Sequence, residues 1–203
     1  VDAITQLLSD FYSDAPAALV SPADYLSRFQ CEQASNREVL LRPQFQLPQA
    51  ALAINRLDMA LATGTELLYE RAQQQRVLDG HGDLRPEHIC MLRPPVAIDC
   101  LEFNPQLRQV DPFDELAYLA LECAMAGLPW VGERLLRGCA AALHDHPAPA
   151  LTHLYTAHRA LLRARLAMAH LLDSEPRTPT KWAPQATRYI AHALVALDAF
   201  NSS

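Results

Sequence analysis

Apolar side chains recur at every third or fourth position through most of this chain. That spacing places them on one face of an α-helix and predicts helices wherever it persists. Proline or glycine stands near the ends of several of these stretches, as is common where helices begin and end. The helices expected in this way cover residues 2–13, a stretch that starts at Pro22, and residues 48–75, 114–127, 130–144, 150–173 and 183–200.

Residues 79–103 depart from the helical pattern. Two short apolar runs, 89–92 and 96–98, are rich in strand-forming residues, and the sequence Arg-Pro-Pro separates them. Short strands joined by a proline-bearing turn predict a β-hairpin. The polar residues 31–48 contain two prolines and predict a connector with at most one short helix. The predicted fold is therefore mainly α with a small β-hairpin insert.

The composition limits the classes of protein to which the chain can belong. Half of its 203 residues are apolar, which fits a globular protein. The net charge is −6, so the chain lacks the excess of basic residues that is typical of nucleic-acid-binding proteins. No run of about eighteen apolar residues occurs, so no membrane span is expected. The five cysteines lack CxxC spacing, which argues against a zinc ribbon or a disulfide framework. Reduced cysteines indicate a cytoplasmic protein.

Two aspartates stand at the ends of the predicted hairpin. Asp83 precedes the first apolar run and Asp99 follows the second, so a hairpin brings their carboxylates toward each other. One carboxylate can accept a proton from a hydroxyl, and the other can bind a hard cation through oxygen. Phosphoryl transfer uses this pairing, since one carboxylate orients the nucleophile and another holds Mg²⁺. From the residues alone, metal binding and acid–base chemistry both remain open.

A resemblance to a known family rests on the sequence around these aspartates. Residues 81–89 read His-Gly-Asp-Leu-Arg-Pro-Glu-His-Ile, and Ile98-Asp99 follows. This arrangement resembles the catalytic and metal-binding motifs of the aminoglycoside phosphotransferase family, which has a protein-kinase-like fold. The chain is more similar still to an uncharacterised bacterial branch of that family. The segments that carry this closer similarity are residues 98–104, Arg108, and residues 111–117 and 155–165, within matching regions of roughly 76–122 and 153–168.

The resemblance implies roles for several residues. Asp83 would be the catalytic base and Asp99 the main Mg²⁺ ligand. His81 would brace the catalytic loop, and Asp114 would anchor that loop from the start of its helix. The implied reaction is ATP-dependent phosphorylation of a hydroxyl on a small-molecule substrate, with ATP and Mg²⁺ as cofactors.

Two departures from the family pattern change this picture. His88 replaces the family's metal-binding asparagine, and imidazole suits softer metals than Mg²⁺, so His88 could bind a metal or hydrogen-bond a phosphate. A complete kinase also has an N-terminal lobe with a glycine-rich loop and a lysine. Here Gly64 is the only glycine before residue 80, and Lys181 is the only lysine. We therefore expect the C-terminal lobe alone, with the N-lobe absent and no activity in isolation.

We expect one domain over residues 1–203. It would consist of N-terminal helices over 1–75, the catalytic loop and metal-binding hairpin over 76–103, and a C-terminal helical bundle over 104–203. An isolated lobe would expose the apolar face that an N-lobe covers. The expected partner is therefore either the missing N-lobe or a second copy in a homodimer.

Several residues keep two interpretations. Glu102 can support the metal site, or it can pair with Arg108 or Arg85. Arg159 and Arg163 are four residues apart and share a helical face. Together they can bind an anionic group, or they can form ordinary surface ion pairs.

Two other functions also stay open. The chain can be a noncatalytic, pseudokinase-like module that binds a ligand or regulates a partner. It can also be a metal-dependent hydrolase that uses Asp83, His88 and Asp99, because a mixed set of imidazole and carboxylate ligands suits a transition metal.

Overall fold

Helix α5 (Pro112–Met125) is buried along most of its length in the structure, a computed structural model that describes residues 1–203. Its sequence is apolar on nearly all sides, which suits a helix surrounded by other elements. Asp111 caps the helix, because its side chain accepts a hydrogen bond from the backbone N–H of Phe113 at 2.8 Å. Pro112 takes the first helical position, so α5 begins before the start predicted at Asp114.

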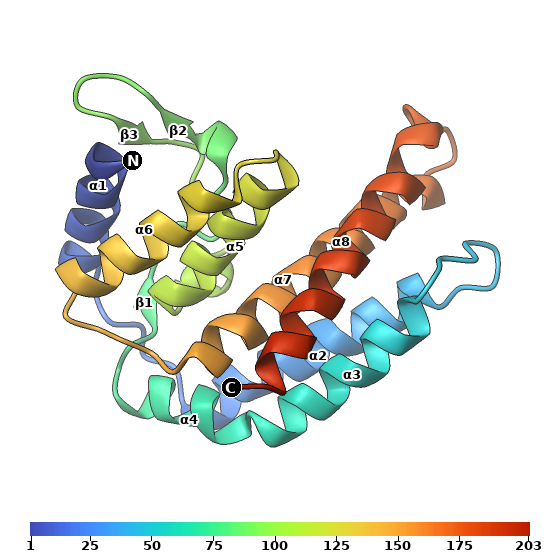
Figure 1. Ribbon diagram of the computed structural model, residues 1–203, viewed down its shortest axis with the longest axis horizontal. Coiled ribbons are helices and arrows are strands. Elements are labelled where there is room, and N and C mark those ends of the chain that lie inside the picture. The colour runs from blue at the N-terminus through green and yellow to red at the C-terminus, as the bar shows by residue number, and fades with distance from the viewer. The chain divides into compact units, whose positions relative to one another are not determined.

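The chain divides into two compact units, and each unit is built from two separate stretches of sequence. The first unit comprises Val1–Pro22 and Leu67–Ala148, and the second comprises Ala23–Glu66 and Pro149–Ser203. Neither unit coincides with one of the three consecutive segments expected from the sequence. Figure 1 shows the elements of both units.

The first unit packs its helices through α6 (Pro129–Ala142). One side of α6 contacts α5 and another contacts α1 (Asp2–Asp14), as Figure 1 shows. Both α1 and α6 match the helices predicted from the apolar spacing. The apolar side chains Leu135 and Leu8 are almost completely buried in this packing, and such burial supplies about 1.5–3 kcal/mol for each leucine.

Two small antiparallel strand pairs complete the first unit. Strand β2 (Ile89–Cys90) pairs with β3 (Val96–Ala97), with Ile89 opposite Ala97, and this confirms the predicted hairpin. A second pair, β1 (Leu78–Asp79) with β4 (Gln109–Val110), was not predicted. Two short 3-10 helices, η1 (Pro86–His88) and η2 (Pro105–Arg108), lie between these strands in sequence. The β1–β4 pair therefore closes the segment that contains the hairpin into one loop.

A buried arginine joins three parts of the first unit. Arg71, on α4 (Thr65–Gln73), pairs with Asp111 (Nε to Oδ2, 2.5 Å) and with Asp145 (Nη2 to Oδ2, 2.7 Å). Burial opposes the charged guanidinium, but hydrogen bonds to Asp145 and Asp111 outweigh it and raise the pKa of Arg71. Burial alone would raise the pKa of Asp145, but the hydrogen bonds and the charge of Arg71 have the larger effect and lower the pKa of that carboxyl. Removing one member of such a cluster leaves buried charge without a partner.

The second unit is built on two long helices. α7 (Pro149–Ala169), extended by η3 (His170–Leu172), lies beside α8 (Pro179–Phe200), and α3 (Ala50–Thr63) contacts both. Aromatic rings link α7 to the remaining helix, α2 (Pro22–Leu40). The ring of Phe29 lies 5.1 Å from that of Tyr25 and 6.0 Å from that of Tyr155, measured between centroids.

Two features of this unit correct the sequence prediction. Residues 31–40 continue α2 and do not form a connector, although the stretch is polar. Gln33 is buried, and its Nε2 donates to the carbonyl of Ile54 at 2.9 Å and to Asp58 Oδ1 at 2.8 Å. The predicted helix 48–75 is two helices, since α3 ends at Gly64 and α4 begins at the next residue.

The fold is mainly helical with a small two-stranded hairpin, as the sequence predicts. None of its helices combines the length and the apolar character needed to cross a membrane.

Candidate functional site

The loop that follows β1 is held by a buried carboxylate. Glu115, on α5, accepts hydrogen bonds from the backbone N–H groups of His81 (3.0 Å to Oε2) and Gly82 (to Oε1). The hydroxyl of Tyr12 donates to the same Oε2 at 3.0 Å. A buried ionised group is tolerated when it is fully hydrogen-bonded. Glu115 therefore fixes the backbone immediately before Asp83.

Two glycines make this close approach possible. A Cβ on Gly80 would lie 2.7 Å from Glu115 Oε2 and 2.5 Å from Val110 Cγ2, so any side chain there would push the loop away from α5. Gly82 has a φ of +86°, in a region where other residues are strained. Both positions therefore need glycine for the loop to turn toward α5.

His81 ties the loop to the end of the hairpin. Its Nε2 lies 2.7 Å from the carbonyl oxygen of Ile98, which can only accept, so Nε2 carries the proton. Its Nδ1 is 3.4 Å from the backbone N–H of Asp83 and accepts from it. The ring is almost fully buried and stacks on that of His88, with centroids 5.7 Å apart. His81 therefore links this loop to Ile98, the residue before Asp99, and its bracing role in a catalytic loop stays a prediction.

The Asp83 carboxylate is held from two sides. The hydroxyl of Tyr118 donates to Oδ1 at 3.1 Å. Arg85 contacts Oδ2 twice, through Nε at 3.0 Å and Nη2 at 2.9 Å. The side chain of Asp83 is 27% exposed, so a small molecule can still reach it. This orientation suits a carboxylate that receives a proton from a substrate hydroxyl.

His88 lies between the two aspartates. Its Nδ1 donates to the backbone carbonyl of Asp83 at 2.7 Å, which leaves Nε2 as the acceptor in the neutral ring. That Nε2 is 3.0 Å from Arg85 Nη2 and 3.3 Å from Asp99 Oδ2. The Nδ1 atom is also 3.9 Å from Asp83 Oδ2. The loop and the hairpin thus bring all three predicted residues to one place.

Asp99 follows β3 and projects into solvent. Its side chain is 76% exposed, and its φ of +63° lies in the left-handed region, which aspartate tolerates better than most residues. No cluster of three or more histidine, cysteine or acidic side chains is arranged to hold a metal ion. Mg²⁺ in phosphoryl-transfer sites is held by one or two carboxylates together with substrate phosphates. Asp99 and His88 therefore fit a cation that also binds phosphate, and a closed all-protein cage does not fit.

The remaining predicted residues lie around this site or in the other unit. Asp114 is buried in the first turn of α5, next to Glu115. Glu102 is exposed, and neither predicted arginine pairs with it: Arg108 pairs with Asp79 (Nε to Oδ1, 2.8 Å), whereas Arg85 pairs with Asp83.

The two arginines expected to bind an anion belong to the second unit, on α7. The guanidinium of Arg163 lies 5.6 Å from the ring centroid of Tyr189, and its Nε is 3.4 Å from the hydroxyl of that residue. Arg159 is largely buried. Their anion-binding role stays a prediction.

Sequence reasoning missed Glu115, Tyr118 and Tyr12. Glu115 has a signal that could have revealed it, since an acidic residue in a helix that is apolar on nearly all sides must be buried and must find donors. Tyr118 is one helical turn beyond Asp114 and carries no comparable signal. Tyr12 is far away in sequence, so only the fold shows its contact with Glu115.

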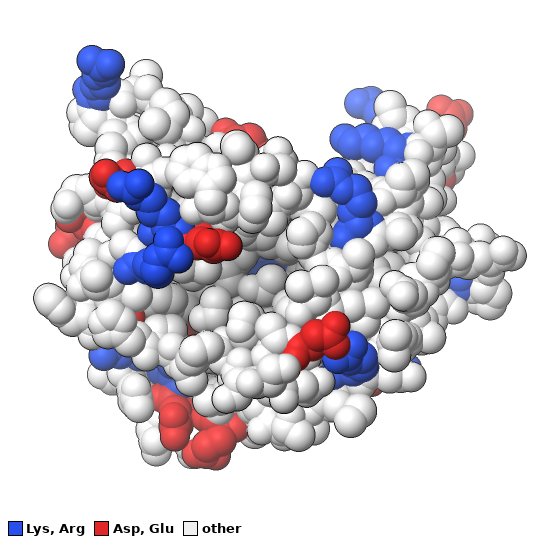
Figure 2. Space-filling model, viewed as in Figure 1, with Lys and Arg blue, Asp and Glu red and all other residues white.

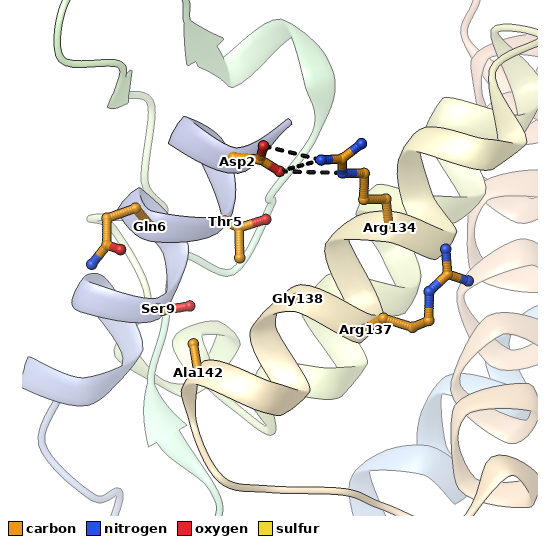
Figure 3. A pocket seen from close by; sticks show the side chains of 8 residues that line it. All are labelled: Asp2, Thr5, Gln6, Ser9, Arg134, Arg137, Gly138 and Ala142. Carbon is orange, nitrogen blue, oxygen red and sulfur yellow. Dashed lines mark hydrogen bonds and ion pairs between the residues drawn. The ribbon is translucent and has the colours of Figure 1, made fainter.

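A separate groove of about 500 Å³ lies between α1 and α6. Figure 3 shows the hydroxyls of Thr5 and Ser9 turned toward α6, while Arg134 reaches across to Asp2 at 2.8 Å. The Ser9 Oγ is buried and has no hydrogen-bond partner. Charged groups of both signs lie next to each other over α6 in Figure 2. The charged side chains that line the groove are Asp2, Arg134 and Arg137, and Asp2 is already paired with Arg134, so we assign the groove no chemistry.

Comparison with known proteins finds similarity to mycobacterial sequences. The chain is 31% identical over 140 residues, or 66% of its length, to uncharacterized protein Rv2004c of Mycobacterium tuberculosis, and equally to uncharacterized protein Mb2027c of Mycobacterium bovis. The match covers 28% of the length of each of these relatives, so the chain spans less than a third of them. No protein-family model matches the chain, and no solved structure matches it.

Proposed function

We propose that this chain carries the catalytic half of an ATP-dependent phosphotransferase site, on the C-terminal lobe of a protein-kinase-like fold. The substrate would be a hydroxyl on a small molecule. One observation carries the proposal: the loop and the hairpin bring Asp83, His88 and Asp99 together, with His88 3.3 Å from Asp99 and 3.9 Å from Asp83. Phosphoryl transfer needs this combination of a base and a cation ligand.

In this proposal Asp83 acts on the substrate hydroxyl. Tyr118 and Arg85 hold its carboxylate in one orientation, and Glu115 holds the backbone that precedes it. A base fixed in this way can accept the hydroxyl proton as the oxygen attacks phosphorus. Correct orientation of a reacting group is itself a large part of catalysis.

Asp99 and His88 would hold Mg²⁺ or a similar cation in the proposed site. When bound, the cation supplies positive charge that stabilises the transferring phosphoryl group. The exposure of Asp99 leaves its carboxylate accessible to a cation that also binds phosphate oxygens, and the Nδ1–H bond of His88 leaves Nε2 as a second ligand 3.3 Å away.

The first unit, which contains this site, has no lysine that could serve as the phosphate-binding lysine of a kinase. Lys181 belongs to the second unit, and its Nζ lies 4.7 Å from the ring centroid of Trp182. The matched region is 28% of each mycobacterial relative. The proposal therefore requires a nucleotide-binding lysine and a glycine-rich loop that the first unit does not supply.

A noncatalytic, pseudokinase-like module is the second candidate. It is favoured by Arg85, whose guanidinium contacts both Asp83 and His88 and so occupies the place where a cation would act. In that case the loop would be a scaffold for ligand or partner binding.

Phosphotransfer by the natural gene product that contains this chain tests the proposal. ATP consumption is measured with Mg²⁺ or Mn²⁺ and a panel of small-molecule alcohols, for the parent protein and for Asp83→Asn. Loss of the base is expected to reduce turnover by about 10²–10⁴-fold. The matched control is Asp14→Asn, which changes an exposed aspartate of the same unit. ATP binding without turnover in the parent protein would favour the noncatalytic module, and turnover that survives Asp83→Asn would exclude Asp83 as the base.

A further inference from the structure

Two hydrogen-bond acceptors face each other in the candidate site. The Nδ1–H of His88 donates to the Asp83 carbonyl, so a neutral ring presents a lone pair at Nε2. That lone pair lies 3.3 Å from Asp99 Oδ2, which is also an acceptor. A positive group placed between the two atoms would satisfy both.

The spacing of these atoms suits two neighbouring ligands of one cation. Divalent ions bind nitrogen and oxygen at about 2.0–2.2 Å, which separates adjacent ligands by about 2.9–3.5 Å in octahedral or tetrahedral geometry. The bond from His88 Nδ1 to a backbone carbonyl is a second, independent sign. Histidines that bind metals commonly donate their other N–H in this way, because the bond fixes the ring orientation.

In this structure the positive group next to these atoms is the guanidinium of Arg85. Its Nη2 is 3.0 Å from His88 Nε2 and 2.9 Å from Asp83 Oδ2, and its Nη1 is 2.5 Å from Glu87 Oε1. A divalent cation on His88 needs the lone pair that Arg85 now uses. The two positive groups cannot share that lone pair.

We propose that Arg85 and a divalent cation compete for the lone pair of His88 Nε2, and that the cation is of the class that accepts imidazole, with Mn²⁺ bound in preference to Mg²⁺. The inference deepens the proposed function, on which it rests for the role of Asp99 as a ligand. When the cation displaces Arg85, the guanidinium can keep its ion pair with Glu87, because the Glu87 side chain is 55% exposed and can move into solvent with it. Loading the site is then an exchange of one cation for another, and Arg85 sets the affinity.

Titration of the whole chain with Mn²⁺, followed by the electron paramagnetic resonance signal of the free ion, tests the exchange. Arg85→Ala is expected to bind Mn²⁺ about tenfold or more tightly than the parent chain, because it removes a positive charge that would lie a few ångströms from the cation. Arg93→Ala is the matched control, because it removes the same charge from the turn of the same hairpin. It is expected to change Mn²⁺ binding by less than about twofold, since exposed charges are screened.

Two further variants separate the causes. Adding His88→Ala to Arg85→Ala is expected to abolish the gain in affinity, and competition with Mg²⁺ is expected to require a large excess of Mg²⁺ only while His88 is present. Arg85→Gln retains a polar side chain, and thermal melting followed by circular dichroism shows which variants remain folded.

The inference is overturned if folded Arg85→Ala and Arg85→Gln both bind Mn²⁺ no more tightly than the parent chain. It is also overturned if Arg93→Ala gains as much affinity as Arg85→Ala, because the effect would then be one of net charge. Neither result depends on turnover. A chain that shows the exchange but belongs to a protein without phosphotransfer would refute the proposed function and leave the metal competition intact.

Discussion

The hydroxyl of Tyr12 donates a hydrogen bond to the Glu115 carboxylate at 3.0 Å across 103 positions of sequence. That carboxylate also receives the backbone N–H groups of His81 and Gly82. Helix α1 thus contacts the same group that positions the loop before Asp83. Stability of the first unit and geometry of the candidate site therefore depend on one buried carboxylate.

Removal of this hydroxyl in Tyr12→Phe should destabilise the protein by about 1.5–3 kcal/mol, the range for a hydrogen bond to a charged group. Urea unfolding followed by circular dichroism measures the change. Tyr69→Phe is the control, because Tyr69 is a partly exposed tyrosine in the same unit. Equal effects of the two substitutions would show that the contact with Glu115 adds nothing to stability.

Burial and the charge of Glu115 raise the pKa of the Tyr12 phenol. The folded protein therefore keeps this proton at a pH where the unfolded chain loses it. The stabilisation is complete below the unfolded pKa of about 10 and declines as pH rises through the folded value. Unfolding measured between pH 8 and about 11 should show a smaller decline in Tyr12→Phe than in the parent protein. Parallel curves for the two proteins would contradict this assignment.

Arg71→Met removes the buried guanidinium that Asp111 and Asp145 share, and Arg76, a more exposed arginine, stays 3.6 Å from Asp145. The expected loss is about 3–5 kcal/mol, since breaking a buried ion pair from one side exposes uncompensated charge. Arg134→Met removes an exposed pair with Asp2 instead and should leave the free energy of unfolding nearly unchanged. A similar loss in both variants would show that burial of the Arg71 cluster has no energetic consequence.

Asp145 should contribute to the acid sensitivity of the protein. Burial raises the pKa of this carboxyl, but Arg71 lowers it by more, so the folded value lies below the unfolded one. The contribution is complete above the unfolded pKa of about 3.9 and is lost as pH falls through the folded value. In Asp145→Asn the free energy of unfolding should decline less steeply below about pH 4. Asp14→Asn, an exposed control, should follow the parent curve.

The close approach of the loop to α5 can be tested at Gly80. Gly80→Ala should cost about 2–3 kcal/mol, because the added Cβ overlaps Val110 and Glu115. Amide hydrogen exchange at His81 and Gly82 should accelerate in this variant, since their acceptor is displaced. Gly127→Ala is the comparison. No atom lies within 4 Å of a Cβ added at this position, so the substitution adds only the backbone strain of its φ of +84°. It should leave exchange at His81 and Gly82 unchanged.

The sequence predicted most helices because their apolar spacing persists over several turns. It failed at residues 31–40, where Gln33 and Asn36 are buried polar residues and look like a loop in sequence. It also missed β1 and β4, since strands of two residues carry no alternating pattern. Their pairing depends on contacts between residues 78 and 110 that no local signal encodes.

The candidate site, like the fold, could be predicted from the sequence only in part. The predicted hairpin brings Asp83 and Asp99 toward each other, and the resemblance adds His88. Their roles stay predictions, but their proximity could be predicted from sequence. The contact of Arg85 with both Asp83 and His88 could not, since it depends on side-chain direction. The resemblance gave the anchoring of the loop to Asp114, whereas the acceptor for the backbone N–H groups of His81 and Gly82 is the next residue, Glu115. These backbone donors have no sequence signature.

The pairing of β1 with β4 has one further consequence. The segment between these two strands contains all three residues of the candidate site, Asp83, His88 and Asp99. Segments of this kind can open as one cooperative unit while the helices around them stay folded. The site could then be lost and regained by local unfolding, so its lifetime would be shorter than that of the protein.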